Sequence, residues 1–303
     1  MEQKTARLAI ARRALAASWQ RTGWDSNPRY AETYTRFPSV LLKPLGHLSK
    51  RPNSIFQMPT NSKHNTAQAK PTLEGFLIID KPVGPTSMQA VARVRHRAGR
   101  IKTGHAGTLD PLASGVLVLG LGKATKLLER IVATDKGYET EIDLSIRTAT
   151  DDLEGEPEIV QVDVPPTQAA VAEALEQFVG DIMQRPPAFS AIKVGGRRAY
   201  ALARQNKPVN LPTRPIQVHS ITLLSYEWPV ATVAISSGKG FYVRSLARDL
   251  GEALETGGCC RSIRRTAVGP FTLDDAIALD DVPDPLDLHM LMPVDTALAK
   301  LEL

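Results

Sequence analysis

The segment GHAGTLDPLASG, residues 104–115, contains the residue types in this chain that are best suited to chemistry. One carboxylate, Asp110, lies between Leu109 and Pro111, among small residues that let a planar ligand approach the backbone closely. His105 adds a hydrogen-bonding aromatic ring to the same loop. A carboxylate placed in this way can act as a nucleophile or as a general base. Because an acid before proline is also a common turn element, the segment alone does not identify a substrate.

The composition is that of a globular protein with reduced thiols. Of the 303 residues, 43% are hydrophobic, which is enough for the core of one large domain or two modest ones. No apolar run approaches the roughly 18 residues that a membrane helix requires. The two cysteines, Cys259 and Cys260, are neighbours and make no disulfide framework. We therefore expect packed, unreactive thiols and a reducing compartment.

The net charge of +5 is unevenly distributed along the chain. Residues 1–70 contain 12 Lys and Arg against 3 Asp and Glu, whereas residues 71–303 contain 25 against 29. If the larger part binds nucleic acid, it must therefore use local clusters of cations rather than its overall charge.

Residues 1–72 differ in character from the rest of the chain. They begin with the Arg-rich, acid-poor stretch MEQKTARLAIARRALAASWQR and end near the polar, linker-like stretch PTNSKHNTAQAK. Three interpretations stay open. The segment is a disordered basic extension, or the product of a translation start assigned too early, with Met58 as a later candidate, or an organelle-targeting peptide.

Regular elements are predicted from about residue 73, and they place the Asp110 loop between a helix and a buried strand. Strands are predicted over the apolar runs 75–80 and 116–122, the second of them buried on both faces. Ser87 and Thr167 are each positioned to cap a helix. The other predicted elements are a helix after residue 122, strands over 137–150, 215–228 and 230–238, and a helix over 242–254. This irregular order predicts an α+β fold with many antiparallel strand pairs.

Five blocks of the sequence together resemble one enzyme family. GHAGTLDPLASGVLVLGLGKATK is similar to the catalytic segment of the TruB-type tRNA pseudouridine synthases, the tRNA pseudouridine-55 synthase family. The other blocks occur in family order and are GFLIIDKPVGPTS, KGYETEIDLSIRTATDDLEG, RPPAFSAIKVGGRRAYALAR and SSGKGFYVRSLARDLGEAL. The resemblance covers nearly two thirds of the chain. It implies the pseudouridine-synthase fold, with a mixed, largely antiparallel central sheet and with flanking helices and loops around a catalytic cleft.

The resemblance implies an isomerase that converts uridine to pseudouridine at position 55 in the T-loop of tRNA. Such an enzyme breaks the bond from C1′ to N1, rotates the freed uracil and joins C1′ to C5. No redox step or hydrolysis occurs, so no cofactor and no metal are expected. The implied partner is the T-arm of tRNA with the target uridine flipped out, without a membrane or an obligate protein partner. We expect a cytoplasmic monomer of bacterial type, with mitochondrial targeting by the N-terminal extension as the minor alternative.

Three residues correspond to the catalytic residues of the family. Asp110 corresponds to the catalytic acid, and Arg244 to the arginine that pairs with it. Tyr138 corresponds to the tyrosine that stacks on the target base and helps to remove the C5 proton. The sequence does not decide whether Asp110 attacks the sugar, attacks the base or takes a proton from C2′.

Further residues correspond to the family's substrate-binding positions. By resemblance, His105 contacts the target nucleotide, Tyr242 belongs to the base pocket, and Ile263 forms an apolar pocket wall. Arg248 is expected in a structural salt bridge. Phosphate contacts are expected collectively from Lys81, Arg93, Arg95, Arg97, Arg100, Lys102, Lys123, Lys126, Lys136, Lys193, Arg197 and Arg198.

The resemblance also sets the expected domain organisation. Residues 1–72 are the basic extension, residues 73–272 the catalytic domain, and residues 273–303 an acidic, Pro-rich tail. The small C-terminal RNA-binding module of the family is expected to be missing. The main alternative function is a catalytically inactive RNA-binding protein or tRNA chaperone of the same fold, and the three catalytic residue types present disfavour it. A uracil-releasing N-glycosidase and a guide-RNA-dependent pseudouridine synthase are further alternatives.

Overall fold

The computed structural model describes residues 73–190, 193–194, 197–198 and 211–302 of the chain. The predictions made for residues 1–72 lie outside these residues and stay predictions. Within the described ranges, no helix is long and apolar enough to cross a membrane.

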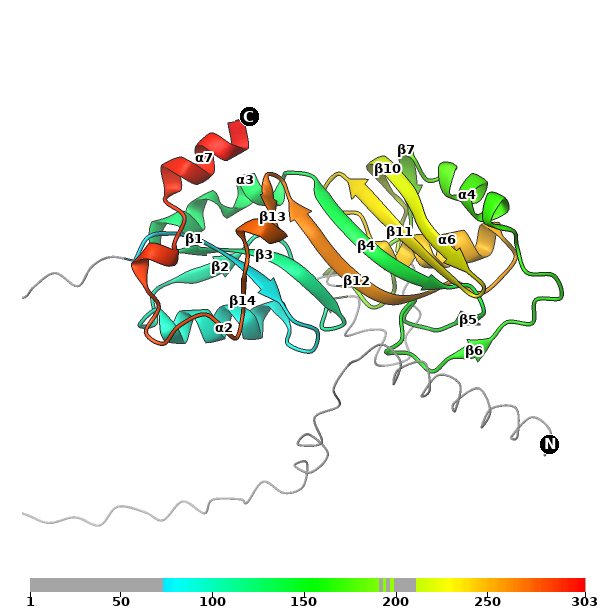
Figure 1. Cartoon of the computed structure of the whole chain (residues 1–303), viewed down its shortest axis with the longest axis horizontal. Helices are drawn as coiled ribbons and strands as arrows, with labels where there is room; N and C mark the ends of the chain where they lie inside the picture. Colours follow the sequence, from blue (N-terminus) through cyan, green and yellow to red (C-terminus); the bar gives the residue numbers. More distant parts are fainter. Residues whose placement is uncertain (1–72, 191–192, 195–196, 199–210, 303) are drawn as a thin grey trace, which may run out of the picture. The chain divides into compact units, whose positions relative to one another are not determined.

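A ten-stranded sheet, mixed but mostly antiparallel, organises the described residues (Figure 1). Its order is β14-β1-β3-β12-β4-β11-β10-β7, while β2 pairs with β3 and β13 pairs with β12. The β1–β14 and β3–β12 pairs are parallel. The strands are β1 (Gly75–Lys81), β2 (Thr103–His105), β3 (Ala113–Leu121), β4 (Lys136–Asp143), β7 (Gly180–Gln184), β10 (Arg214–Glu227), β11 (Val230–Ser237), β12 (Cys259–Val268), β13 (Phe271–Thr272) and β14 (Ile277–Ala278). The predicted α+β fold around a largely antiparallel sheet is confirmed.

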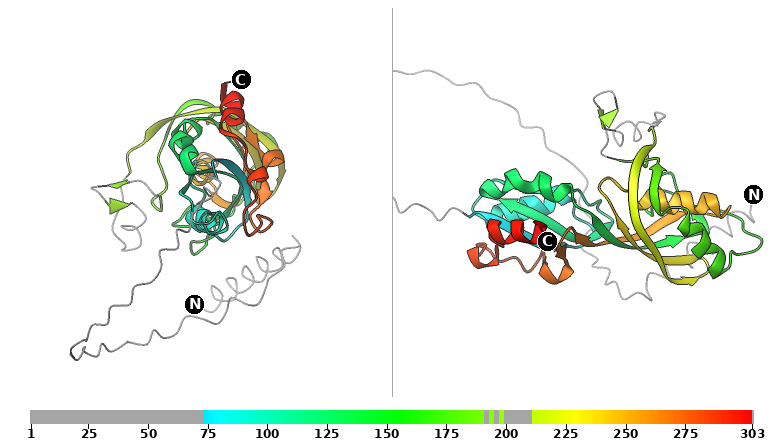
Figure 2. Two further views of the ribbon diagram at one scale, coloured as in Figure 1. Left: turned by 90° about the vertical axis from the view of Figure 1, so that its left-hand side faces the viewer. Right: turned by 90° about the horizontal axis from the view of Figure 1, so that it is seen from above.

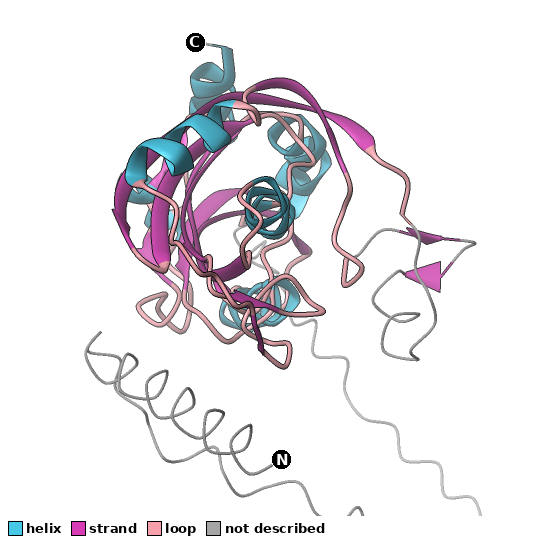
Figure 3. Ribbon diagram, turned by 90° about the vertical axis from the view of Figure 1, so that its right-hand side faces the viewer, coloured by secondary structure: helices cyan, strands magenta, loops and turns pink. Residues whose placement is uncertain are grey.

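Helices pack against several strands of this sheet. Helix α2 packs against β2, α4 against β10, and α6 against β12 and β4, and Figures 2 and 3 show these helices around the curved sheet. Thr167 caps α4, as predicted. The helical segments are α2 (Ser87–Arg97), η2 (Gly122–Leu127), α3 (Leu128–Val132), α4 (Gln168–Glu176), α6 (Val243–Ala253), η3 (Leu273–Asp275), η4 (Leu288–Met290) and α7 (Val294–Glu302). Two small hairpin pairs, β5 (Ile146–Arg147) with β6 (Glu158–Ile159) and β8 (Lys193–Val194) with β9 (Arg197–Arg198), complete the fold.

The start of α2 differs by one residue from the prediction, and it ties the helix to the Asp110 loop. Thr86, not Ser87, is the N-cap, because its hydroxyl accepts from the Gln89 N–H and the Gln89 side chain accepts from the Thr86 N–H. The Ser87 hydroxyl instead donates to the carbonyl oxygen of Leu109 at 3.0 Å and accepts from the Leu109 N–H at 2.7 Å. Helix α2 thereby holds the residue that precedes Asp110.

Strand β3 anchors the other side of the Asp110 loop in the middle of the sheet. It lies between β1 and β12, and its apolar run is buried as predicted. Gly115 lets β12 approach: a Cβ atom at this position would lie 2.2 Å from the carbonyl oxygen of Arg265, and the φ angle of Gly115 is +101°. Both the close approach and the left-handed backbone therefore require glycine here.

We expect Gly115→Ala to destabilise the protein by about 3 kcal/mol, because β12 must shift to make room for the methyl group. The matched control is Gly180→Ala: Gly180 has a φ of +97°, but a Cβ atom there would meet nothing within 4 Å. The control should cost only about 1 kcal/mol, the backbone strain alone. Urea unfolding followed by circular dichroism measures both values, and equal losses would contradict the close-packing argument.

The C-terminal segment packs along β1 (Figure 1). Strand β14 pairs with β1, and Phe76 and Met292 exchange two backbone hydrogen bonds of 2.9 and 2.7 Å. Ala297 of α7 is buried in the same apolar cluster as Phe76. The Arg97 guanidinium of α2 donates to the carbonyl oxygen of Leu279 at 3.0 Å. These contacts place the segment on the same sheet as the preceding residues; the predicted domain boundary at residue 272 stays a prediction.

The two cysteines are packed thiols, as predicted. Cys259 and Cys260 are both free and buried. Burial raises the pKa of each thiol to about 12, so neither is a thiolate at neutral pH.

Candidate active site

Asp110 lies on the loop that joins β2 to β3, and the backbone of this loop is fixed. The Ala113 N–H donates to the carbonyl oxygen of Asp110 at 3.1 Å, and the Gly84 N–H donates to that of Pro111 at 2.8 Å. The Asp110 side chain is nevertheless 40% exposed. The carboxylate is therefore held on a rigid support and is open to a ligand.

Arg244, the second residue of α6, forms an ion pair with Asp110. Its Nη2 atom lies 2.7 Å from Oδ2 of Asp110, while its own side chain is only 6% exposed. Nη2 also donates to the carbonyl oxygen of Phe189 at 3.0 Å, and Nη1 donates to that of Thr150 at 3.1 Å. The fold thus brings together the acid and the arginine that the resemblance pairs, although they are far apart in the sequence.

Asp152 is a second partner of Arg244, and the sequence reasoning missed it. Its Oδ2 atom lies 3.1 Å from Nη1 of Arg244, and its side chain is only 1% exposed. Its Oδ1 atom accepts from the Thr150 hydroxyl at 2.6 Å and from the Glu154 N–H at 3.0 Å. Arg244 therefore bridges one open carboxylate and one closed carboxylate.

The two carboxylates determine the electrostatics of Arg244. Burial opposes the charged guanidinium, but Asp110 and then Asp152 outweigh this effect, so the pKa of Arg244 lies above its ordinary value. Asp110 accordingly has a fixed positive partner on its closed side. Because Asp152 faces that guanidinium and is buried, it is not placed to activate a water molecule as a second glycosidase-type carboxylate would.

Gln184 fixes the backbone where α6 begins, next to Tyr242. Its Oε1 atom accepts from the Tyr242 N–H at 2.9 Å, and its Nε2 atom donates to the Tyr242 carbonyl oxygen at 3.1 Å. Burial raises the pKa of the half-buried Tyr242, and the charges of Asp110 and Arg244 also act on it. Tyr242 is the N-cap of α6 and so lies two residues before Arg244 in the chain. Arg248, one turn further along α6, pairs with Asp151 at 3.1 Å, which is the structural salt bridge predicted for it.

Tyr138 lies on β4, directly opposite Arg265 of β12. Its ring is tilted against that of Phe241, with 6.5 Å between the centroids. Burial raises the pKa of Tyr138, while the charge of Arg265 acts in the opposite direction. Asp110 is also among the charges that act on the phenol. Arg265 in turn donates to the Gly107 carbonyl oxygen at 3.2 Å, which connects the strand pair that carries Tyr138 to the Asp110 loop.

His105 and Ile263, the other two predicted substrate-binding residues, lie on strands β2 and β12. His105 ends β2, and its Nδ1 atom is buried without a hydrogen-bond partner among the described residues. Burial lowers the pKa of His105, and the charge of Arg265 acts in the same direction. Ile263 lies on β12 opposite Thr140 and is buried in the main apolar cluster. It lies two residues from Arg265 and so points to the same face of the strand.

No metal-binding cluster accompanies these residues. Among the described residues, no group of three or more His, Cys, Asp or Glu is arranged to hold a metal ion. The arrangement that is present consists of an open carboxylate, a buried guanidinium and an aromatic ring. A carboxylate of this kind can act as a nucleophile or base on a flat, electron-poor ring or on its attached sugar.

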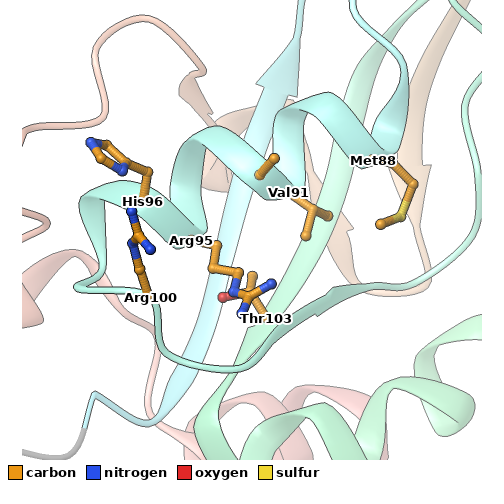
Figure 4. A pocket seen from close by; sticks show the side chains of 7 residues that line it. Met88, Val91, Arg95, His96, Arg100 and Thr103 are labelled. Carbon is orange, nitrogen blue, oxygen red and sulfur yellow. The ribbon is translucent and has the colours of Figure 1, made fainter. Parts of the chain in front are cut away.

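A basic groove runs along α2 (Figure 4). Its lining residues are Met88, Val91, Ala92, Arg95, His96, Arg100 and Thr103. Met88 lies at one end of the groove and His96 and Arg100 at the other, while Thr103 of β2 lies beside Arg95 (Figure 4). Arg95 and Arg100 make no ion pair within the described part of the chain, whereas Arg93 pairs with Asp280. The cations that line the groove are therefore available to a ligand, whereas Arg93 is already paired with a carboxylate.

Comparison with known families and relatives gives a consistent result. The family model described as "TruB family pseudouridylate synthase (N terminal domain)" matches residues 95–243, and "tRNA pseudouridylate synthase B C-terminal domain" matches residues 244–299. A protein of Corynebacterium aurimucosum named tRNA pseudouridine synthase B is 44% identical over 230 residues, covering 75% of this chain and 77% of that protein. A protein of Ruegeria pomeroyi with the same name is 45% identical over 235 residues, covering 76% and 77%.

Solved structures share the fold. The crystal structure of a Cbf5–Nop10–Gar1 complex matches with a TM-score of 0.59 and 28% identity, covering 76% of this chain and 63% of the matched chain. The structure of an H/ACA RNP bound to a substrate RNA containing 2′-deoxyuridine matches with a TM-score of 0.52 and 27% identity, covering 72% and 59%. This chain therefore spans less than two thirds of each of those two matched chains.

Proposed function

Because the chain belongs to the TruB family of pseudouridylate synthases, we propose that its target is the uridine at position 55 in the T-loop of tRNA. Conversion of uridine to pseudouridine in tRNA is the reaction that the names of its relatives describe, and the chain is an isomerase of this kind. The observation that carries the proposal furthest is the open Asp110 carboxylate, 2.7 Å from the buried Arg244 guanidinium.

Asp110 is the catalytic carboxylate in this proposal. With the target uridine flipped into the site, the carboxylate promotes cleavage of the bond from C1′ to N1, either as a nucleophile or by taking a proton from C2′. The freed uracil turns, and C5 joins C1′. Arg244 supplies the positive charge that holds the carboxylate in place, and Asp152 supports Arg244 from behind.

The aromatic residues hold the base in this proposal. Tyr138 stacks on the uracil and takes up its C5 proton, and Tyr242 lines the same pocket. His105, whose pKa lies below its ordinary value because of burial, is a neutral ring at neutral pH and contacts the target nucleotide. Ile263 contributes an apolar wall.

The family acts on RNA, and the proposed partner of this chain is the T-arm of tRNA. A cytoplasmic monomer without an obligate protein partner is part of the same proposal. A catalytically inactive RNA-binding protein of the same fold is the less favoured function, because such a protein has no use for an open carboxylate paired with a buried arginine that a second, buried carboxylate supports.

The proposal is tested with unmodified tRNA transcripts labelled with tritium at C5 of uracil. We expect tritium release by the full chain, and a carbodiimide-dependent primer-extension stop at position 55. A transcript with cytidine at position 55 should release no tritium above background. Release that persists from that transcript would move the target to another position, and no release from either transcript would favour the inactive RNA-binding protein.

The groove along α2 should contact RNA phosphates. We expect Arg95→Gln with Arg100→Gln to weaken tRNA binding and to reduce the slope of log K against log salt by about two, one for each lost phosphate contact. The matched double variant is Arg93→Gln with Arg130→Gln, because Arg93 pairs with Asp280 and Arg130 with Glu302. Filter binding at salt concentrations from about 50 to about 300 mM, over which screening of surface charges increases strongly, measures both slopes. Equal slopes in the two variants would remove the groove from the RNA interface.

A further inference from the structure

Arg265 is a buried cation that has no carboxylate partner within the part of the chain that the structure describes. Its side chain is 2% exposed. Its Nε atom donates to the carbonyl oxygen of Val116 at 2.8 Å, and its Nη2 atom donates to that of Gly107 at 3.2 Å. Burying a charge against neutral groups alone is costly, and burial lowers the pKa of Arg265 accordingly. A valine or leucine would fill such a position at a lower cost in folding free energy, so we infer that the charge of Arg265 serves a function.

The group that faces this cation is the hydroxyl of Tyr138. Arg265 and Tyr138 are direct partners in the antiparallel β12–β4 pair, which places their side chains on the same face of the sheet. This register sets the guanidinium beside the phenol, and the charge of Arg265 acts to lower the pKa of Tyr138, which burial raises. A positive charge in a dry site stabilises negative charge on a neighbouring phenol oxygen.

Arg265 also connects the tyrosine to the loop of the catalytic carboxylate. The acceptor carbonyl of Gly107 lies three residues before Asp110, and Val116 lies on β3 just after the same loop. One guanidinium thus contacts β3, the Asp110 loop and the β4 tyrosine. A shift of the Arg265 guanidinium would therefore move the Asp110 loop relative to the Tyr138 phenol.

The other charged groups near this pair are identified by their electrostatic effects. Asp110 acts on Tyr138 from the loop, and the charge of Arg265 acts on His105 of β2, on Lys81 of β1 and on Lys136 of β4. Asp110 is the one negative group among them. Among the charges that act on Tyr138, that of Arg265 has the largest effect.

We propose that Arg265 is a positioning residue of the reaction, which holds the Tyr138 hydroxyl and stabilises the phenolate that accepts the C5 proton of the rearranged base. This inference rests on the proposed function. After C1′ has joined C5, that carbon still carries its hydrogen. The phenolate oxygen takes the proton, the C–H electron pair forms the C5=C6 bond, and the former C6=N1 pair goes to N1, which gains a proton from water. The net change moves one proton from C5 to N1, and no oxidant or reductant is needed.

The test uses the full chain in single-turnover assays with C5-tritiated tRNA between about pH 6 and pH 10.5, where the rate should rise with pH because the pKa of the Tyr138 phenol lies above its ordinary value. Arg265→Gln should slow tritium release about 100-fold at neutral pH, with tRNA affinity retained, and should move the rise of the rate with pH to higher pH. The sign follows because loss of the cation raises the pKa of the phenol. Arg265→Lys, which keeps the charge, should recover part of the rate.

Two comparisons separate this role from a merely structural one. In a Tyr138→Phe background, Arg265→Gln should change the remaining rate by no more than about twofold, because two residues that act through one group are not additive. Arg264→Gln is the matched control, since Arg264 is the neighbouring residue of β12 and pairs with Asp80 at 2.8 Å. It should leave the rate and the pH profile unchanged.

One variant leaves the arginine in place, so the test does not depend on the folding of Arg265→Gln. Tyr138→3-fluorotyrosine makes the phenol more acidic and should move the rise of the rate to lower pH. An unmoved profile in this variant, or additive losses in the double variant, would overturn the inference while the wild-type chain still forms pseudouridine. Absence of pseudouridine with the wild-type chain would instead contradict the proposed function.

Discussion

Asp110→Asn is expected to abolish pseudouridine formation, with a loss of more than about 10⁴-fold in the single-turnover rate. The amide has the shape of the carboxylate and still accepts a hydrogen bond from Arg244, so the loop geometry is retained. It has neither the charge nor the nucleophilicity that bond cleavage at C1′ requires. Tritium release from C5-labelled tRNA measures the loss, and tRNA affinity should stay within about threefold of wild type because the variant removes no cation.

The matched control for this variant is Asp80→Asn. Asp80 is partly exposed like Asp110 and also pairs with an arginine, Arg264, at 2.8 Å, but it lies on β1 rather than on the loop. We expect the control to keep wild-type turnover. If Asp110→Asn released tritium as fast as the control does, Asp110 would lose its assigned role.

The strands that position the site could be predicted from the sequence because their signals are local. The apolar run of β3 is unbroken, and it is buried on both faces. The resemblance supplied Arg244 as the partner of Asp110, but no periodicity or spacing would have paired residues that lie so far apart. Long-range pairs of this kind follow from the strand order, which the sequence pattern does not specify.

Neighbouring residues of the same type show where prediction from sequence ends. Asp151 and Asp152 are adjacent acids, yet Asp151 pairs with Arg248 while Asp152 turns inward to Arg244. The backbone separates them, because Asp151 has a φ of +60° and so breaks the extended run. A type-based argument treats the two acids as equal, and only the tertiary structure distinguishes them.

Arg264 and Arg265 show the same limit within a strand. Successive residues of β12 point to opposite faces, so Arg264 pairs with Asp80 while Arg265 is buried. One signal was available: Arg265 is two residues from the apolar Ile263 and so shares its face. A charged residue on the buried face of a strand is a candidate for function, but identifying that face requires knowledge of what covers it.

Arg244→Lys is expected to lower the turnover number about 1,000-fold, although it keeps the positive charge. The guanidinium contacts Asp110 with Nη2 and Asp152 with Nη1, and it also reaches two backbone carbonyl oxygens. The single, compact ammonium group of lysine lacks the forked guanidinium and cannot hold both carboxylates at these distances. We expect it to remain with the buried Asp152, since an unpaired charge there costs more than one on the partly exposed Asp110.

The comparison that decides this argument is with Arg248→Lys on the same helix. Arg248 is also mostly buried and pairs with Asp151 at 3.1 Å and Asp249 at 2.8 Å, but it does not contact Asp110. Its variant should show a loss of stability in thermal unfolding similar to that of Arg244→Lys, because both exchange a forked contact for a single one. It should keep turnover within about threefold of wild type, because the Asp110 contact is intact. Parallel losses of turnover in the two variants would assign Arg244 to the stability of α6, whereas a loss confined to Arg244→Lys places its effect on the Asp110 carboxylate.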